Sequence, residues 1–356
     1  GASRFARADR ALGDPLADEG RYGEAVQRVV EADGIDVLLP VTEAAMRAIL
    51  GRFEHDRSRI PFGDLASFLG ICDKGRVLEV AAELGIAVPE QRVVESPEQI
   101  DRELEQDLPF PLVLKPARSV SAGAAGALVK SSVHYARDRE ALRTGLRATP
   151  EASFPIFLQQ RIVGPGIGVF LLLWDGRLVA RFGHRRIREK PPSGGVSVYR
   201  ESVAVDPALL AKAQALLERF GWEGVAMVEF KVDRASGVPY LMEINPRFWG
   251  SLQLALDAGV DFPRLLVEAA LGMDPTGPDR YRTGVRSRWW WGDVDQMIIR
   301  LRGRAGALDL PPDAPGTGAV LRDFLRLWWP GDRSEVLRLD DLRPFLRETR
   351  LWFGRS

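Results

Sequence analysis

Glu243-Ile244-Asn245-Pro246-Arg247 ends a predicted β-strand at residues 239–245, and Glu229 lies in the predicted strand before it, residues 225–232. Both strands alternate between side chains of different polarity, and the turn-forming sequence DRASGV separates them. Antiparallel pairing across this turn would place Glu229 opposite Glu243, with Asn245 on the same face. Because like charges that face each other across a ladder repel, the hairpin requires either a shared proton or a cation.

The chemistry of this face favours a divalent metal. Two carboxylates and an amide carbonyl form an all-oxygen set of the kind that Mg²⁺ uses when it also keeps waters and substrate phosphates as ligands. Glu229, Glu243 and Asn245 are therefore candidate metal ligands, for Mg²⁺ or Mn²⁺. Arg247 follows directly and can bind a phosphate or carboxylate through two hydrogen bonds. An exposed hairpin would explain each residue singly, but not their shared face.

Composition excludes several classes of protein. The 356 residues are 46% hydrophobic, enough for two or three subdomains. Lysine plus arginine equals aspartate plus glutamate, at 49 each, so no global charge argues for nucleic acid. No apolar run is long enough to span a membrane, and no secretory signal is visible. The single cysteine, Cys72, fits a reducing compartment, so we expect a cytoplasmic protein.

The N-terminal region has incomplete α/β character. A helix over 21–34, a buried strand at Ile35–Leu39 and a helix over 43–53 capped by Thr42 are predicted. Such a domain usually begins with an apolar strand and a glycine turn, so we expect that the natural domain starts further upstream. A Rossmann-type dehydrogenase would need a G-x-G-x-x-G turn after an early strand. The GPGIG stretch at 164–168 lies instead between two predicted strands.

Two lysines stand where secondary-structure elements begin or end. Lys74 opens a predicted helix over 74–85, and Lys115 ends a predicted strand over 110–116. The small-residue stretch 117–130 follows, and a glycine-containing loop after such a strand suits phosphate binding by backbone N–H groups. A simple turn between hairpin strands would explain the same stretch equally well.

The C-terminal part is rich in tryptophan. It includes Trp289–Trp291, Trp328-Trp329 and Trp352, and Asp293 is predicted to cap a helix that reaches Arg302. Such a segment could form a homodimer or contact a partner or a membrane surface. Acidic residues are mixed with the basic ones, which favours packing back onto the body of the protein.

The order of these elements resembles the ATP-grasp superfamily, in the branch that looks like carbamoyl phosphate synthetase and biotin carboxylase. The resemblance covers roughly residues 35–272 and rests mainly on the E…E-x-N-P-R hairpin with the two upstream lysines. It implies an ATP-grasp fold of mixed α+β and α/β type, in which two α+β lobes clamp ATP. The domains implied are a partial Rossmann-like domain at 1–70, a linker helix and small lobe at 71–160, a large lobe at 161–275 and a C-terminal extension at 276–356.

The resemblance also implies roles for particular residues. Lys74 and Lys115 would hold the α- and β-phosphates, and the loop 119–126, with Ser119, Gly123 and Gly126, would cover them. The backbone of Gln160 and Ile162 would contact adenine, assisted by the Gln159 side chain. Arg247 would meet the transferred phosphoryl group. The basic segment 184–202 would bind the acceptor, with Arg188 and Lys190 as first candidates and His184, Arg185 and Arg186 as secondary ones.

The reaction implied has two steps. A carboxylate attacks the γ-phosphate to give an acyl phosphate and ADP, and an amine then displaces phosphate to give an amide, so the partners are small-molecule carboxylates and amines. Members of the superfamily often carry an acidic residue for the ribose after the hinge, where this chain has GPGIG. The alternative is therefore a catalytically silent, ATP-binding regulatory module of the same fold.

Overall fold

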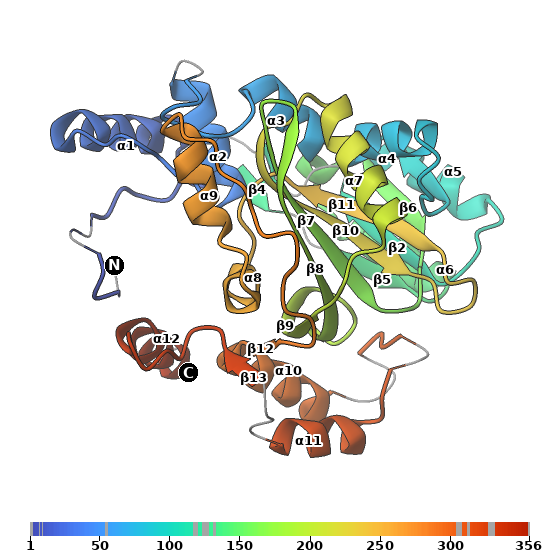
Figure 1. The fold of residues 1–356 in the computed structure, drawn as a ribbon. Coiled ribbons are helices and arrows are strands. Elements are labelled where there is room, and N and C mark those ends of the chain that lie inside the picture. Colours follow the sequence, from blue (N-terminus) through green and yellow to red (C-terminus); the bar gives the residue numbers. More distant parts are fainter. Residues whose placement is uncertain are drawn as a thin grey trace.

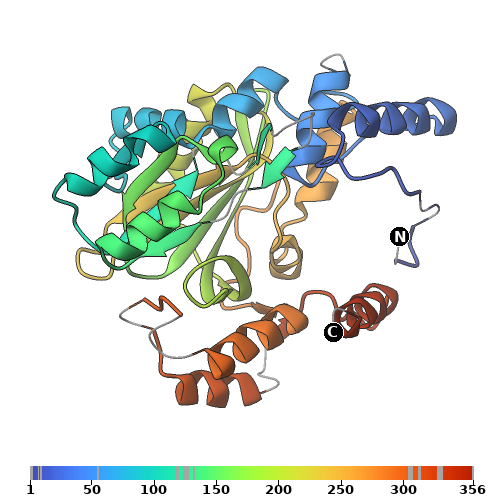
Figure 2. The ribbon, with the colours of Figure 1, turned by 180° about the vertical axis from the view of Figure 1, so that it is seen from behind.

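A computed structural model gives the structure of residues 3–6, 8, 10–53, 56–116, 120–122, 128–130, 133–303, 308–311, 314–326 and 332–354. The elements form a large sheet and a small sheet, with helices around them and a separate group of C-terminal helices (Figures 1 and 2). Among the described residues, no helix has the length and apolar character needed to cross a bilayer.

The large sheet has seven strands in the order β11-β10-β7-β8-β9-β12-β13. Its neighbours pair antiparallel except for β12 and β13, which are parallel. Its strands are β7 (Gly166–Trp174), β8 (Arg177–Lys190), β9 (Val196–Ser202), β10 (Gly224–Val232), β11 (Pro239–Asn245), β12 (Arg286–Arg288) and β13 (Asp332–Ser334). The long apolar run of β7 is buried almost throughout, as expected for a central strand that is covered on both faces.

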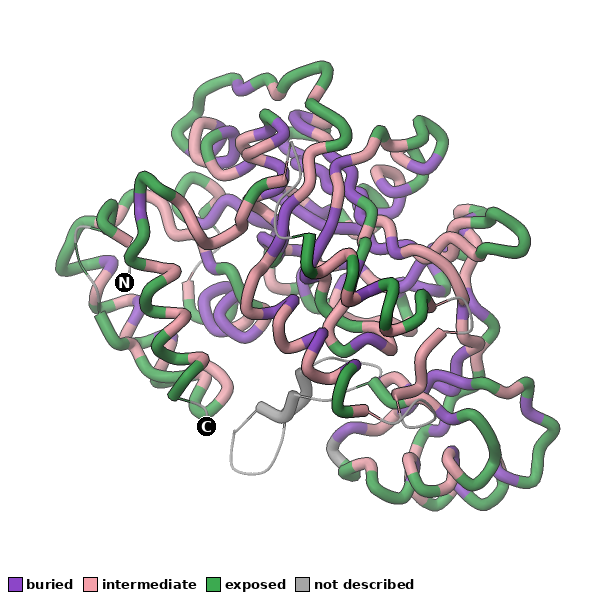
Figure 3. Tube along the Cα trace, turned by 90° about the horizontal axis from the view of Figure 1, so that it is seen from below, coloured by how far each residue is buried: buried purple, intermediate pink, exposed green. Residues whose placement is uncertain are grey.

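Helices cover the large sheet and share its hydrophobic core. They are α7 (Pro207–Arg219), α8 (Leu252–Ala258) and α9 (Phe262–Ala270). Figure 3 shows that buried residues concentrate in the centre of the molecule, whereas the tube near the C-terminus is mainly exposed or intermediate. The two hairpin strands predicted for this lobe are present as β10 and β11, within one residue of their expected bounds.

The small sheet has four strands in the order β1-β6-β2-β5 and a hydrophobic core of its own. Its strands are β1 (Gln91–Val94), β2 (Leu112–Pro116), β5 (His134–Ala136) and β6 (Ile156–Gln160). Beside it lie α5 (Ile100–Glu105), α6 (Arg139–Arg147), the 3-10 turns Pro97–Gln99 and Glu151–Ser153, and a two-stranded pair, β3 (Val120–Ala122) and β4 (Leu128–Lys130). Two separate cores give the chain two lobes.

The N-terminal region is helical. It contains α1 (Glu19–Asp33), α2 (Glu43–Arg52), α3 (Leu65–Cys72) and α4 (Lys74–Glu83). Thr42 caps α2 as predicted, accepting a hydrogen bond from the Ala45 N–H at 3.2 Å. The strand predicted at Ile35–Leu39 is wrong. This segment forms no strand and pairs with none of the described strands. The Leu38 N–H instead donates a hydrogen bond to the Arg59 carbonyl at 2.8 Å.

The C-terminal extension packs back onto the large lobe, as the mixed charges predicted. Its helices are α10 (Trp290–Arg302), α11 (Thr317–Leu325) and α12 (Arg343–Phe353), and α10 lies against β8 and β9. Trp291 stacks on Trp352 with ring centroids 4.4 Å apart, which joins α10 to α12. The expectation that Asp293 caps α10 is wrong: Asp293 lies inside the first turn and is fully buried in an ion pair.

Candidate functional site

The hairpin of β10 and β11 has the predicted register. Glu229 lies directly opposite Glu243, and Met227 lies opposite Asn245, so the two carboxylates and the amide share one face. This face lines a cavity of about 660 Å³ between the two sheets. Lys115 and Tyr135 reach the same cavity from the small sheet.

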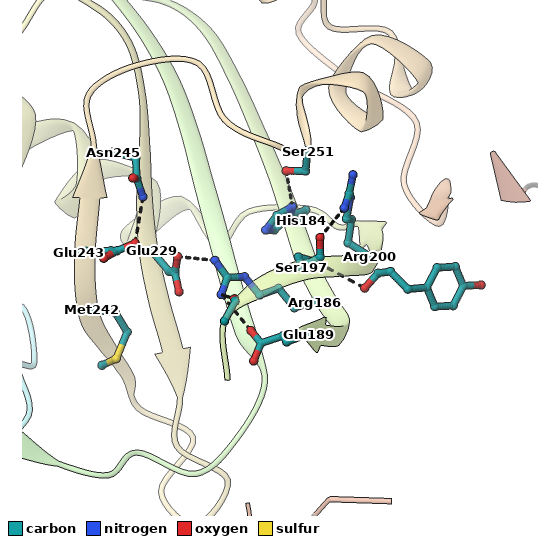
Figure 4. Close-up of polar contacts among 12 residues, drawn as sticks. His184, Arg186, Glu189, Ser197, Arg200, Glu229, Met242, Glu243, Asn245 and Ser251 are labelled. Atoms are coloured by element: carbon teal, nitrogen blue, oxygen red, sulfur yellow. Dashed lines mark hydrogen bonds and ion pairs between the residues drawn. The ribbon is translucent and has the colours of Figure 1, made fainter. Parts of the chain in front are cut away.

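A cation on β8, the second strand along the sheet from β10, offsets the repulsion between Glu229 and Glu243. Arg186, on β8, forms an ion pair with Glu229 and a second with Glu189 at 2.9 Å, as Figure 4 shows. Burial raises the pKa of Glu229 to about 7, although Arg186 opposes the shift, and the charge of Glu243 adds to it. The repulsion between the two carboxylates is therefore reduced in both ways that the sequence predicted. A cation lies nearby, and one carboxyl group binds a proton near neutral pH.

Glu243 has the opposite electrostatic environment. Burial alone would raise its pKa, but Lys74, Lys115 and a hydrogen bond from the Asn245 amide together lower that pKa below its usual value. The Asn245 Nδ2 donates to Glu243 Oε1 at 3.1 Å. One member of the carboxylate pair is thus held ionised, while its partner titrates near neutrality.

The two predicted lysines converge on the hairpin from different elements. Lys115 stands near the end of β2, with its Nζ 4.0 Å from the Met242 Sδ on β11. Lys74 opens α4, and it lines a small adjoining cavity with Glu243 and Glu43. Burial, and then the charge of Lys74, lower the pKa of Lys115 to about 8. A buried cation whose protonated form is destabilised is suited to binding an anion that restores its charge.

Arg247 stands at the junction of two cavities. Its guanidinium donates to the Asn245 Oδ1 at 2.8 Å and to the Phe248 carbonyl at 2.9 Å. It lines the cavity between the sheets and also a second cavity of about 890 Å³ beside α1 and α2. Glu43 lines that second cavity too, and burial raises its pKa.

The donor chemistry of the hairpin fits a hard divalent cation. Glu229, Glu243 and Asn245 offer only oxygen ligands toward a metal, and Mg²⁺ prefers oxygen. The described residues contain no group of three or more histidine, cysteine, aspartate or glutamate side chains placed to hold a metal. The protein set is thus two carboxylates and one amide, which leaves further positions for waters or phosphate oxygens.

The structure does not bring Arg188 and Lys190 to the cavity. Arg188 is buried and binds both oxygens of Asp293, at 2.7 and 2.6 Å, and it also pairs with Asp323. Lys190 pairs with Asp295 at 2.8 Å. The register of β8 against β9 shifts on both sides of Arg188, so the alternation that would place it beside Arg186 is broken.

The predicted hinge residues also stand apart from this cavity. Gln159, Gln160 and Ile162 end β6 or follow it, and none of them lines the cavity. The Gln160 N–H donates to the Glu90 carbonyl at 2.8 Å, and the Gln159 side chain contacts that of Gln91. Ser119, Gly123 and Gly126 lie outside the described residues.

Sequence reasoning gave too little weight to several residues that line the cavity. Arg186 was only a secondary candidate, and Glu189, Arg200 and Glu335 were not candidates. Arg186 could have been found by carrying the alternation of β8 onward from His184, which shares its face. No pattern in the sequence near Glu335 indicates a site residue, because Glu335 lies far along the chain from the hairpin residues that line the cavity.

Comparisons with known proteins bear on the fold of the chain. Residues 153–291 match a family model described as ATP-grasp in the biosynthetic pathway with Ter operon. A search of curated protein sequences found no match.

Solved structures resemble the chain in fold at low sequence identity. An L-amino acid ligase from Bacillus licheniformis matches with a TM-score of 0.56 at 17% identity, covering 72% of this chain and 61% of that one. A Campylobacter jejuni biotin carboxylase complex gives 0.56 at 16% identity, covering 75% and 61%. An N5-carboxyaminoimidazole synthetase from Staphylococcus aureus gives 0.54 at 14%, covering 76% and 68%. The matched part therefore spans about three-fifths of the first two proteins. These matches confirm the predicted resemblance, and the chain has the ATP-grasp fold.

Proposed function

We propose that this chain is an ATP- and Mg²⁺-dependent ligase that activates a carboxylate as an acyl phosphate and joins it to an amine, with release of ADP. The observation that carries this proposal is one cavity between two lobes in which Lys115 faces Glu229, Glu243, Asn245 and Arg247. Fixed cations and metal-binding oxygens around one cavity are what transfer of a phosphoryl group between anions requires.

The residues of this cavity would divide the work as follows. Lys74 and Lys115 would neutralise the non-transferred phosphates. Glu229, Glu243 and Asn245 would hold Mg²⁺, which supplies charge neutralisation at the phosphate oxygens when bound. Arg247 would face the transferred group, where its fixed charge reduces repulsion between the attacking carboxylate and the triphosphate.

The second step joins the two substrates. The amine nitrogen forms a bond to the acyl carbon, and the bond from that carbon to the phosphate oxygen breaks with its electron pair. Two protons leave the original ammonium: one is lost to solvent before attack, and the other ends on the released phosphate. Walls from both lobes around the cavity would limit hydrolysis of the acyl phosphate by water.

The test measures ADP release with a panel of carboxylic acids and with hydroxylamine as a small universal acceptor. Hydroxylamine converts an acyl phosphate to a hydroxamate, which gives a coloured complex with ferric iron, so activation is seen without the natural amine. ATP binding with neither ADP release nor hydroxamate, for any acid, would favour the regulatory module that the sequence left open. A Glu243→Gln variant serves as the negative control.

A further inference from the structure

The C-terminal extension forms part of the cavity. One wall of this cavity, the far wall, contains Trp289 from the segment before α10, and Glu335 and Val336 from the segment after β13. Arg200 on β9 and Ser251 before α8 line the same end. The catalytic hairpin and this far wall thus belong to one continuous space.

A buried pair of opposite charges marks this wall. Arg200 is 1% exposed and forms an ion pair with Glu335, whose side chain is 12% exposed. Arg200 also donates to the Ser197 carbonyl at 2.6 Å. Burial lowers the pKa of Arg200 and raises that of Glu335, which means that burial disfavours the charged form of each side chain. Buried ion pairs contribute little net stability, which makes a role in binding worth testing for a pair that lines a cavity.

The extension holds Glu335 in place. The Glu335 N–H donates to the Arg288 carbonyl at 3.0 Å, and Asp332, three residues earlier, accepts from the Tyr199 hydroxyl at 3.1 Å. Deeper in the lobe, Arg188 ties α10 to β8 through Asp293. A carboxylate fixed by such contacts is positioned before a ligand arrives.

Two further polar atoms at this cavity make no hydrogen bond within the described part of the chain. His184 Nε2 and Trp249 Nε1 are buried, and within the described part of the chain neither has a hydrogen-bond partner. Both side chains line the cavity. The Ser251 hydroxyl lies 3.1 Å from the other ring nitrogen of His184, which leaves Nε2 available to a ligand (Figure 4). Buried polar atoms without partners are rare in proteins, so together they indicate a polar ligand.

We propose that the far end of the cavity is the acceptor subsite of the ligase, and that it takes an amino acid whose ammonium group lies on Glu335 and whose carboxylate lies on Arg200. This inference rests on the ligase function proposed above. A zwitterion can replace each partner of the ion pair without changing the net buried charge. A simple amine would leave Arg200 buried without a counter-charge, which is strongly unfavourable. Because Arg200 and Glu335 are in contact, the two groups of the acceptor must be close together, as in an α- or β-amino acid.

The experiment separates activation from acceptor binding. The hydroxylamine assay first identifies an acid that the wild-type protein activates. Standard L-amino acids are then compared as acceptors with primary amines of matched side chain that lack the carboxylate. Glu335→Gln should raise the KM for the amino acid by at least about tenfold, the value of a lost hydrogen bond to a charged group. Hydroxamate formation should change less than about twofold, because hydroxylamine needs no subsite.

Matched variants exclude a structural explanation. Asp340→Asn removes an exposed carboxylate of the same extension that does not line the cavity, so it should leave the acceptor KM unchanged. Glu335→Asp should restore part of the affinity. An unchanged KM in Glu335→Gln, faster turnover in that variant, or simple amines accepted as well as amino acids would each overturn the proposal.

A binding measurement keeps the two proposals distinguishable. Isothermal titration of L-amino acids into the protein with Mg²⁺ and ADP reports the subsite without any turnover. Binding that depends on Glu335, in the absence of hydroxamate formation with every acid, would refute the ligase function and leave the amino acid subsite standing. Hydroxamate formation without amino acid binding would refute the subsite alone, and absence of both would refute both proposals.

Discussion

Lys115 should make nucleotide binding depend on pH in a range where most lysines do not titrate. Burial and Lys74 lower its pKa to about 8, from an ordinary value of 10.5. The phosphates of a bound nucleotide favour the charged form and should return the pKa to its ordinary range. Above pH 8, binding must therefore be accompanied by proton uptake, and the apparent affinity for ATP should fall as the pH rises.

The size of the effect follows from the two pKa values. Near pH 7.5 most of Lys115 carries its proton in the free protein, and near pH 9.5 almost none does. If the complex has the ordinary pKa, the apparent affinity should fall roughly 20-fold between these pH values, or about 1.8 kcal/mol. A lysine of ordinary pKa would give a change of less than about twofold over the same range.

The assay is titration calorimetry with a non-hydrolysable ATP analogue across this pH range at constant ionic strength. Lys115→Arg keeps its charge throughout, so this variant should bind with little dependence on pH. Lys115→Met should bind weakly at every pH. The reasoning would be refuted if the wild-type protein and Lys115→Arg showed the same pH profile, because the titrating group would then lie elsewhere.

Three further predictions concern the hairpin and the extension. Glu243→Gln should lower turnover by at least about 100-fold while changing nucleotide affinity much less, because it removes a metal ligand and not a phosphate contact; single-turnover kinetics with binding measurements would check this. Arg188→Gln should lower the free energy of unfolding by about 3–5 kcal/mol, since Asp293 is fully buried, whereas the exposed pair of Arg185 should be worth less than about 1 kcal/mol in Arg185→Gln, both measured by urea unfolding. Mg²⁺ binding near pH 6.5 should release roughly three-quarters of a proton from Glu229, whose pKa is about 7, and almost none near pH 8.5; calorimetry in buffers of different ionisation enthalpy would show a constant release if another group were responsible.

The sequence predicted best where structure is local. The register of Glu229 with Glu243 followed from two alternating strands and one short turn, because period-2 geometry fixes both faces once the turn is placed. Thr42 was predicted as a helix cap for the same reason, since its partner is three residues away. Lys74 and Lys115 were singled out by their positions at the start of a helix and the end of a strand, and the resemblance to a known superfamily then supplied their roles.

Prediction failed where contacts between distant segments decide the outcome. Ile35–Leu39 has the composition of a strand, but a strand forms only with a neighbour to pair with. Arg188 was expected at the acceptor site because it lies in the basic segment that the resemblance to ATP-grasp proteins assigns to that site. Register shifts in β8 and the carboxylate of Asp293 turn it toward the C-terminal extension instead. The residues near Arg188 in the sequence predict neither the register shifts nor the ion pair with Asp293.

Ion pairs on β8 explain how the hairpin can form with two opposed carboxylates before any metal binds. Arg186 pairs with Glu229 and with Glu189, so its charge offsets the repulsion between Glu229 and Glu243. Arg188, two residues further on, instead binds Asp293 of the C-terminal extension, because the register of β8 shifts on both sides of it. The basic strand therefore supplies one arginine to the hairpin and one to the C-terminal helices, and the register shifts explain why residues so close in sequence differ in role.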